Sequence, residues 1–270
     1  MKKNSIILAL FMLASAYTVC YGQQKSKTKT FTVNNVSFTM VYVEGGDAVI
    51  GRTSEQDQRY ISCDECVACG RDGLLQYKPV QVTLNSYWIG QTEVTQELWE
   101  AVMGENPSRN KDNPKQPVTN VSWDDCRVFI TRLNALTGEV FRMPTEAEWE
   151  FAARGGMFSQ WYKFSGSNNR EEVACDGTCP VATKKANELG IYDMSGTVKN
   201  WCKNGVDCIG LLEGGNNPQG CSRCGYRISR GGYDLLGIAH TRCSYKPDIR
   251  LSNTGLRLAR SVKQKIVEED

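Results

Sequence analysis

Short stretches rich in β-branched and aromatic residues predict several strands in the first 90 positions. Residues 31–33 and 36–43 form the first two, with Asn34-Asn35 between them. Because asparagine tolerates the left-handed backbone of a tight turn, this pair predicts a hairpin. Residues 52–78 are polar, cysteine-rich and without period, which indicates a surface insertion. Further strands are predicted at residues 48–50, 79–84 and 87–89.

The middle of the chain shows the capping residues and apolar spacing of α-helices. Thr95 is a residue type that caps helix N-termini, and Gly104 is a suitable stop for the helix that follows it. A second helix begins after Ser122, with Asp125 three residues on, and continues to Gly138. Its apolar residues at helical spacing are Cys126, Phe129, Ile130, Leu133 and Leu136.

A third helix is predicted in "PTEAEWEFAARGG", where Thr145 and Glu148 make a capping box and Gly155 ends the helix. We expect Trp149 and Ala153 to face the core. The remaining sequence is loop-rich. Short strands are predicted near residues 190–192, 226–229 and 255–258. Strands, then helices, then irregular strands indicate an α+β fold, without the alternation or the fingerprints of nucleotide-binding folds.

The N-terminus predicts export. Two lysines precede an apolar run at residues 6–19, which is too short to span a bilayer as a helix. We place signal-peptide cleavage after Gly22, with Ala16 as the second choice. Cys20 leaves a lipid anchor open, although the residues before it are not the small ones that lipoprotein processing prefers. No second run of spanning length follows, so we expect no transmembrane segment in the mature chain.

These boundaries predict one domain within the 270 residues. A length of 270 residues with 40% hydrophobic positions is enough to bury a large core. The net charge of +2 provides no excess of cations to neutralise phosphates, so we expect no nucleic-acid partner. The predicted segments are a signal peptide at residues 1–22, a polar linker at 23–30, the domain at 31–262 and a polar tail at 263–270.

Twelve cysteines give the chain an unusual thiol content. In an exported protein the usual fate of cysteine is a disulfide, and the favoured pairs are local: Cys175 with Cys179 and Cys202 with Cys208. Two distant CxxC steps, in "SCDECVACG" and "GCSRCG", also leave a tetrahedral zinc site open.

Six ordered blocks resemble one protein family. They are "YWIGQTEVTQELW", "QPVTNVSWDDCRVFITRLNALTG", "FRMPTEAEWEFAARGG", "LGIYDMSGTVKNW", "RISRGG" and "NTGLRLA". Together they resemble the sulfatase-modifying-factor family, the formylglycine-generating-enzyme domain, over more than three quarters of the chain. The resemblance implies a loop-rich single domain with a variant of the C-type lectin fold.

The resemblance also implies where catalysis would take place. Active members bind copper(I) through two cysteines just after the Gly-Gly of the "RGG"-like block, and with oxygen they convert a sulfatase cysteine to formylglycine. Soft thiolates suit copper(I). Here the matching stretch, "YDLLGIAHT" at residues 233–241, contains no cysteine, and Cys243 matches a third, non-ligand position. We therefore do not expect copper, although thiols displaced from other positions leave an oxidase open as the alternative.

Other catalytic arrangements lack their residues. Family branches that use mononuclear iron hold it with several histidines, whereas this chain has only His240. No serine stands in a nucleophile-elbow context either. The chain is therefore predicted to be non-catalytic.

One metal site of the family has matching residues. The resemblance implies a structural calcium ion held by Glu93, Asp193 and the carbonyl groups of Met194, Gly196 and Val198. Carboxylate and carbonyl oxygens are the ligands that calcium prefers. The family's "GNVWEW" reads "GTVKNW" here, so an inward-pointing Lys199 would weaken the site. An ion pair between Glu93 and a nearby arginine is the alternative.

The combined prediction is a secreted, non-catalytic family member that binds a protein or glycan in the periplasm or outer cell envelope. Residues 233–240 would form the recognition loop. Its ligand contacts would be Tyr233, Asp234, His240 and Arg242, with Gly231-Gly232 and Arg242 fixing the loop ends. As an alternative, Leu235, Leu236 and Ile238 fill the core where the copper site was lost.

Overall fold

The computed structural model describes residues 26–51, 79–177, 179–196, 198–206, 214–232, 237–238 and 241–262. Its strands are β1 (Thr28–Val33), β2 (Val36–Val43), β3 (Gly46–Ile50), β4 (Val80–Leu84), β5 (Tyr87–Gly90), β6 (Phe141–Arg142), β7 (Lys199–Val206), β8 (Gly215–Asn216), β9 (Tyr226–Gly231), β10 (Arg242–Tyr245), β11 (Thr254–Gly255) and β12 (Ala259–Ser261). Its helices are α1 (Gln96–Met103), α2 (Trp123–Thr137), α3 (Glu146–Ala153) and α4 (Arg170–Val173), with a 3₁₀ turn at Gly156–Phe158. The predicted signal peptide, the insertion at 52–78 and the C-terminal tail lie outside the described residues.

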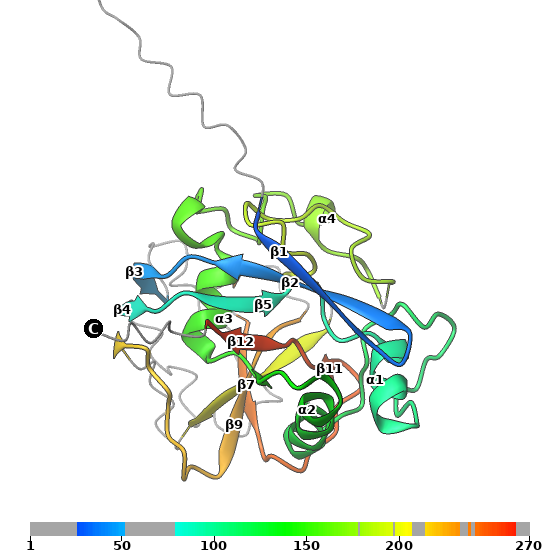
Figure 1. Cartoon of the computed structure of the whole chain (residues 1–270). Coiled ribbons are helices and arrows are strands. Elements are labelled where there is room, and N and C mark those ends of the chain that lie inside the picture. Colours follow the sequence, from blue (N-terminus) through cyan, green and yellow to red (C-terminus); the bar gives the residue numbers. More distant parts are fainter. Residues whose placement is uncertain are drawn as a thin grey trace, which may run out of the picture.

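The largest sheet joins the two ends of the domain. Its strand order is β1-β2-β5-β12-β6, with antiparallel pairing throughout. β1 and β2 form the predicted hairpin, and Asn34 and Asn35 occupy its turn with φ of 45° and 65°. β12, from the last described segment, lies beside β5 (Figure 1) and pairs with β6 on its other side. The domain is therefore closed by pairing between distant parts of the sequence.

Two smaller sheets complete the strand framework. One has the order β10-β9-β7-β11 and the other the order β3-β4-β8. The strand predicted near 226–229 is confirmed as β9. Two predictions in this region are wrong: residues 190–192 form no strand, and the strand expected at 255–258 is replaced by β11 and β12 on either side.

The three predicted helices are confirmed together with their caps. The Thr95 side chain accepts from the N–H of Leu98, and Gly104 adopts a left-handed backbone with φ of 84°. Ser122 and Asp125 form the capping box of α2. α1 and α2 pack against each other beside the β1–β2 hairpin (Figure 1). Their buried faces form one core cluster with that hairpin.

Helix α3 is the centre of a second core cluster. It contacts β3, β7 and β9, and every one of its eight residues is buried. Trp149 and Ala153 face the core as predicted, and both have 0% exposure. Its charged residues are therefore buried as well, and their partners define the site described next. Among the described residues no helix is long and apolar enough to cross a membrane.

Candidate functional site

Three glutamates project from α3 into the protein. The predicted capping box fixes the start of the helix: the Thr145 side chain accepts from the N–H of Glu148, and the Glu148 carboxylate accepts from the N–H of Thr145 at 2.8 Å. A buried carboxylate is stable only when it is paired. Glu148 meets this requirement through Arg142, which donates to it at 2.7 and 2.6 Å.

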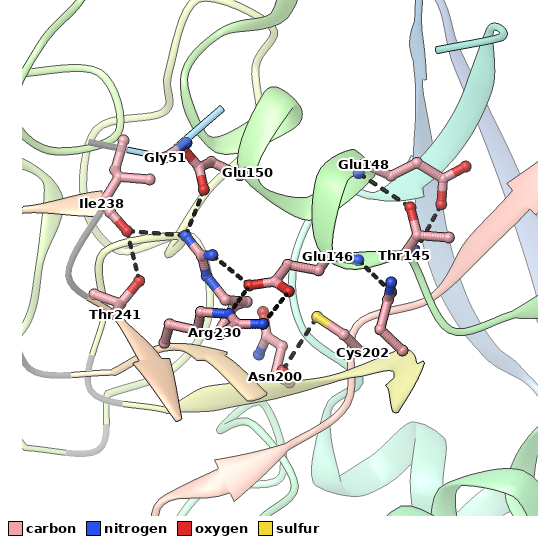
Figure 2. Close-up of polar contacts among 12 residues, drawn as sticks. Gly51, Thr145, Glu146, Glu148, Glu150, Asn200, Cys202, Arg230, Ile238 and Thr241 are labelled. Carbon is pink, nitrogen blue, oxygen red and sulfur yellow. Dashed lines mark hydrogen bonds and ion pairs between the residues drawn. The ribbon is translucent and has the colours of Figure 1, made fainter. Parts of the chain in front are cut away.

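Glu146 and Glu150 share Arg230 of β9 (Figure 2). Arg230 donates to Glu146 through Nη1 and to Glu150 through Nη2, each at 2.8 Å. Arg242 of β10 also donates to Glu146, at 2.5 and 3.0 Å. Arg154 binds the second oxygen of Glu150 at 2.8 Å. Among the described residues, three guanidinium groups thus bind these two carboxylates.

The guanidinium groups keep both carboxyl groups of this cluster charged. Burial by itself raises the pKa of Glu150, but the charges of Arg154 and Arg230 outweigh burial and hold its pKa at about 2. In the same way burial is outweighed at Glu146, where Arg242 and Arg230 keep the pKa below its ordinary value. The cluster is therefore a permanent ionic link between α3, β9 and β10 at neutral pH.

The Gly-Gly pair after Arg230 is required by the backbone. Gly231 and Gly232 have φ of 84° and 93°, where residues with a Cβ are strained. A Cβ on Gly231 would lie 3.1 Å from the Trp149 ring, and one on Gly232 would lie 2.7 Å from Cγ of Lys199. The chain therefore leaves β9 in a fixed direction, close to α3 and β7.

The ionic cluster also holds the segment that follows the glycines. The carbonyl oxygen of Ile238 accepts from Arg230 Nη2 at 3.2 Å and from the Thr241 hydroxyl at 2.9 Å (Figure 2). The N–H of Ile238 donates to the carbonyl of Lys163. The Ile238 side chain is 2% exposed and belongs to the α3 core cluster. Of the three aliphatic residues that the alternative interpretation placed in the core, Ile238 is found there, and Leu235 and Leu236 lie outside the described residues.

Of the four predicted ligand contacts, the structure describes only Arg242. Tyr233, Asp234 and His240 lie outside the described residues. Arg242 is 8% exposed and its guanidinium is bound to Glu146, so it fixes the end of the loop. Direct contact of these four residues with a ligand stays a prediction.

The free thiols in the described chain are poorly suited to copper(I). They are Cys126 on α2, Cys202 on β7 and Cys243 on β10. Burial raises the pKa of both Cys126 and Cys202 well above the ordinary value, so these two remain protonated thiols. Since thiolate is the form that binds metal, the described part of the chain presents no reactive pair. Copper ligands drawn from the cysteines at 63, 66, 69 and 208 would lie outside it.

The disulfide predictions have mixed outcomes. Cys175–Cys179 is confirmed, and a second bridge joins Cys221 and Cys224. The pairing of Cys202 with Cys208 is wrong, because Cys202 is a free thiol buried in β7. The oxidised Cys221–Cys224 step also removes one half of the zinc site that the two CxxC steps left open.

Four of the five predicted calcium ligands surround one small cavity. Glu93, Asp193, Gly196 and Val198 line it, and the Cys175–Cys179 disulfide forms another wall. Its volume of about 20 Å³ is enough for a single water-sized species. Met194 is not among the lining residues and packs in the core instead. The fold therefore brings two carboxyl groups and turn backbone to one small cavity.

The oxygen donors at this cavity fit a calcium ion, but the negative charge that they offer it is reduced. Burial, together with the neighbouring Asp193, raises the pKa of Glu93 to about 8 in spite of Arg257, so this carboxyl group lacks full compensation. Glu93 Oε2 is buried and makes no hydrogen bond with the described residues; an ion pair with Arg257 lies at 3.3 Å. The alternative pairing with an arginine is thus present. Arg257 competes with a cation for the same oxygen.

Lys199 points away from this cavity. Its ammonium group bonds the hydroxyl of Tyr245 at 3.2 Å, and Cys243 and Tyr245 together raise its pKa against the opposing effect of burial. The predicted weakening of the calcium site by an inward Lys199 therefore does not arise.

No group of three or more His, Cys, Asp or Glu side chains able to hold a metal occurs in the described segments, so a cation here depends on backbone carbonyls.

Sequence comparison assigns the chain to a family. The sulfatase-modifying factor enzyme 1-like domain matches residues 24–262. The chain belongs to this family. It is 32% identical over 247 residues to the chaperone protein LppX of Paenibacillus barcinonensis, over 68% of this chain and 84% of that protein. It is also 28% identical over 190 residues to the formylglycine-generating enzyme of Thermomonospora curvata, over 60% of each chain.

Solved structures confirm the fold. Treponema denticola variable protein 1 superposes with a TM-score of 0.71 at 29% identity, over 87% of this chain and 99% of that one. PvdO from Pseudomonas aeruginosa superposes with a TM-score of 0.66 at 21% identity, over 87% and 98%. The predicted single-domain, C-type-lectin-like variant of the formylglycine-generating-enzyme fold is therefore confirmed.

The ionic cluster was not predicted. Its signal is visible in hindsight, because Glu146 and Glu150 stand one turn apart on a helix whose other faces are also buried. A helix with acidic residues on a solvated face has the same local pattern. Only the pairing of β9 and β10 against α3 distinguishes the two cases.

Proposed function

We propose that the protein is a non-catalytic member of its family and acts by binding a partner. The observation that carries this proposal is the absence of cysteine from residues 233–241, the stretch after the Gly-Gly pair. In addition, the free thiols of the described chain include two that burial keeps protonated. The framework around that stretch is nevertheless fixed, by the glycine backbone and by the Arg230 ion pairs. A fixed framework without a thiol pair favours binding over oxidation.

The partner proposed is a protein or glycan in the bacterial cell envelope. Export is supported by the N-terminal sequence and by two disulfides, a bond type favoured in oxidising compartments. A relative named as a chaperone protein supports a binding role. The polar residues Tyr233, Asp234 and His240 are the proposed contacts, while Ile238 anchors the segment that carries them.

The alternative function is a formylglycine-generating oxidase with a displaced thiol pair. The match to formylglycine-generating enzymes is the observation that favours it. Since burial keeps Cys126 and Cys202 protonated, such an enzyme would need at least one thiolate from the cysteines outside the described residues.

A peptide assay separates the two functions. The full chain is incubated with copper(I), oxygen and a synthetic sulfatase-motif peptide, and mass spectrometry measures conversion of the peptide cysteine to formylglycine. The related Thermomonospora curvata enzyme serves as the positive control. We expect no conversion by this chain. Copper-dependent conversion would establish the oxidase and reject the non-catalytic proposal.

We also propose that the cavity at Glu93 and Asp193 binds a structural calcium ion. The ligands would be the two carboxylates with the carbonyl groups of Gly196 and Val198, supplemented by that of Met194. The ion would neutralise the carboxylates and fix the turn that leads into β7. Because Arg257 already supplies one positive charge there, we expect weak affinity.

A further inference from the structure

A second pocket lies at the C-terminal end of α3. None of the residues considered so far as ligand contacts lines it. Its volume is about 300 Å³, at the lower end of the roughly 300–1,000 Å³ typical of ligand pockets. Strand β3 contributes Asp47, Ala48 and Val49, and α3 contributes Phe151 and Arg154. Gln81 of β4 and Gly156, Met157, Ser159 and Trp161 complete the lining.

The side chains that line this pocket are mainly apolar, and two of them are more than half exposed. The side chains of Met157 and Trp161 are 54% and 59% exposed. Trp161 is held in place by a left-handed backbone with φ of 56° and by its N–H, which donates to the Ser159 hydroxyl at 3.2 Å. Tryptophan, methionine and arginine are the residue types enriched where proteins bind partners. An apolar group is therefore the expected occupant of the slot.

Arg154 adds a cationic hydrogen-bond donor to the pocket. Its Nε and Nη2 donate to Glu150 and to the carbonyl of Gly51, each at 2.8 Å. Its Nη1 makes no hydrogen bond with a described residue. Guanidinium groups bind carboxylates through strong charge-assisted hydrogen bonds. The Nη1 donor at the pocket wall therefore favours a ligand carboxylate at Arg154.

Asp47 adds a hydrogen-bond acceptor to the pocket. Its Oδ1 accepts from the Thr83 hydroxyl at 2.6 Å, so the carboxylate is fixed at the pocket wall. A second acceptor in the pocket suits a ligand that also offers an N–H group and disfavours a simple anion. A carboxylate, an apolar side chain and an amide N–H occur together at the last residue of a polypeptide.

We propose that this pocket binds the C-terminal residue of a polypeptide when that residue is large and apolar. The α-carboxylate bonds Arg154 Nη1, the side chain packs between Met157, Phe151 and Trp161, and the amide N–H donates to Asp47. This binding site goes beyond the proposed function, because it does not involve residues 233–242. A fatty acid shares the apolar body and the carboxylate but lacks the N–H group.

Ligand-observed NMR on the full chain tests the proposal with defined probes. The peptide Ac-Gly-Gly-Phe is compared with its C-terminal amide, with Ac-Gly-Gly-Gly and with octanoate. We expect the acid to bind and its amide to bind about tenfold more weakly or worse, since a charged hydrogen bond is lost. We expect the triglycine peptide to bind undetectably and octanoate more weakly than the Phe peptide.

Two variants locate the site. Trp161→Ala should weaken binding of Ac-Gly-Gly-Phe by about tenfold, because it removes an aromatic wall. Val140→Ala, which truncates a 69% exposed side chain outside the pocket, should leave binding unchanged. Equal binding of the acid and the amide, or an unaffected Trp161→Ala variant, overturns the proposal. Octanoate binding as tightly as the peptide rejects a polypeptide end. Absence of binding by the Phe peptide rejects the site altogether.

Discussion

At the scale of single residues, charge pairing inside α3 explains why the helix tolerates burial on every side. Glu150 is fully buried and faces Arg154 on its own helix, Arg230 on β9 and the N–H of Gly51 after β3. Each contact favours the ionised form. Removing one partner of such a group leaves the other partners uncompensated, so these residues are more sensitive to substitution than their number of apolar contacts suggests.

Glu150→Gln should lower the free energy of unfolding by about 3–5 kcal/mol at pH 7, because it breaks a buried ion pair. The folded protein holds the pKa of Glu150 at about 2, below the ordinary 4.5, so its stabilising effect is present above pH 4.5 and is lost as pH falls towards 2. The fall in pKa corresponds to about 3 kcal/mol. Urea unfolding at pH 7, 5 and 3 should therefore show a narrowing gap between wild type and variant.

A matched control is Glu172→Gln, whose half-exposed carboxylate pairs with an exposed lysine. We expect this control to stay within about 1 kcal/mol of the wild type. A Glu150→Gln gap that is constant between pH 7 and 3 would contradict the assignment of its ionisation.

Trp149→Ala should lower the free energy of unfolding by about 3–5 kcal/mol, the usual cost of removing a buried tryptophan ring. The ring has 0% exposure, its Nε1 donates to Asn200 at 3.0 Å, and the Arg230 guanidinium lies 5.3 Å from the ring centroid. Trp161→Ala is the control, because its ring is 59% exposed. Similar losses in the two variants would show that burial does not account for the effect.

At the scale of elements, the segment after β9 combines an anchor with positions proposed to contact a partner. Ile238 is bound at its backbone by Arg230 and Lys163 and is buried in the α3 core. Replacing residues 233–240 by a Gly-Ser segment of equal length should therefore lower the melting temperature. Restoring isoleucine at 238 alone should recover most of the loss, which is about 2–5 kcal/mol for a buried isoleucine.

Thermal unfolding of the two replacements measures the contribution of Ile238 directly. Equal melting temperatures for the complete replacement and the wild type would show that this segment contributes nothing to the core. A loss that isoleucine does not recover would place the stabilising contacts elsewhere in the segment.

The sequence predicted those elements whose signals are local. Caps at Thr95, Ser122 and Thr145 and the Asn34-Asn35 turn act over a few residues, so α1, α2, α3 and the β1–β2 hairpin were all predicted. Strand β12 has three residues and pairs with both β5 and β6. No local pattern marks such a strand, because its stability comes from partners more than 100 positions away.

The sequence pointed to Glu93 and Asp193, which line one cavity, but it did not point to the ionic cluster. The positions of Glu93 and Asp193 follow from the family motifs, whereas Arg230, Glu146 and Glu150 meet only after α3 packs on β9. Cys202 shows the limit of spacing arguments, since only five residues separate it from Cys208 and yet its thiol is free and buried in β7. Side-chain direction within a strand decided the outcome.

At the scale of the whole molecule, a calcium ion at Glu93 and Asp193 would tie the strand-rich core to the turn before β7. Millimolar calcium should raise the melting temperature, by about 2–4 °C for each kcal/mol that binding adds to the stability, and EGTA should reverse the rise. Glu93→Gln should abolish the response, while Asp176→Asn, at an exposed carboxylate, should preserve it. An unchanged melting temperature with calcium would reject the ion.

We propose that the fold of the formylglycine-generating enzymes is retained here without their copper chemistry. Copper(I) titration of the reduced full chain against a competing chromophoric chelator tests it most directly, with the Thermomonospora curvata enzyme as reference. We expect no stoichiometric, tight copper(I) binding, because residues 233–241 contain no cysteine and burial keeps Cys126 and Cys202 protonated. One equivalent of copper(I) held by two cysteine thiolates, as seen by X-ray absorption, would contradict it.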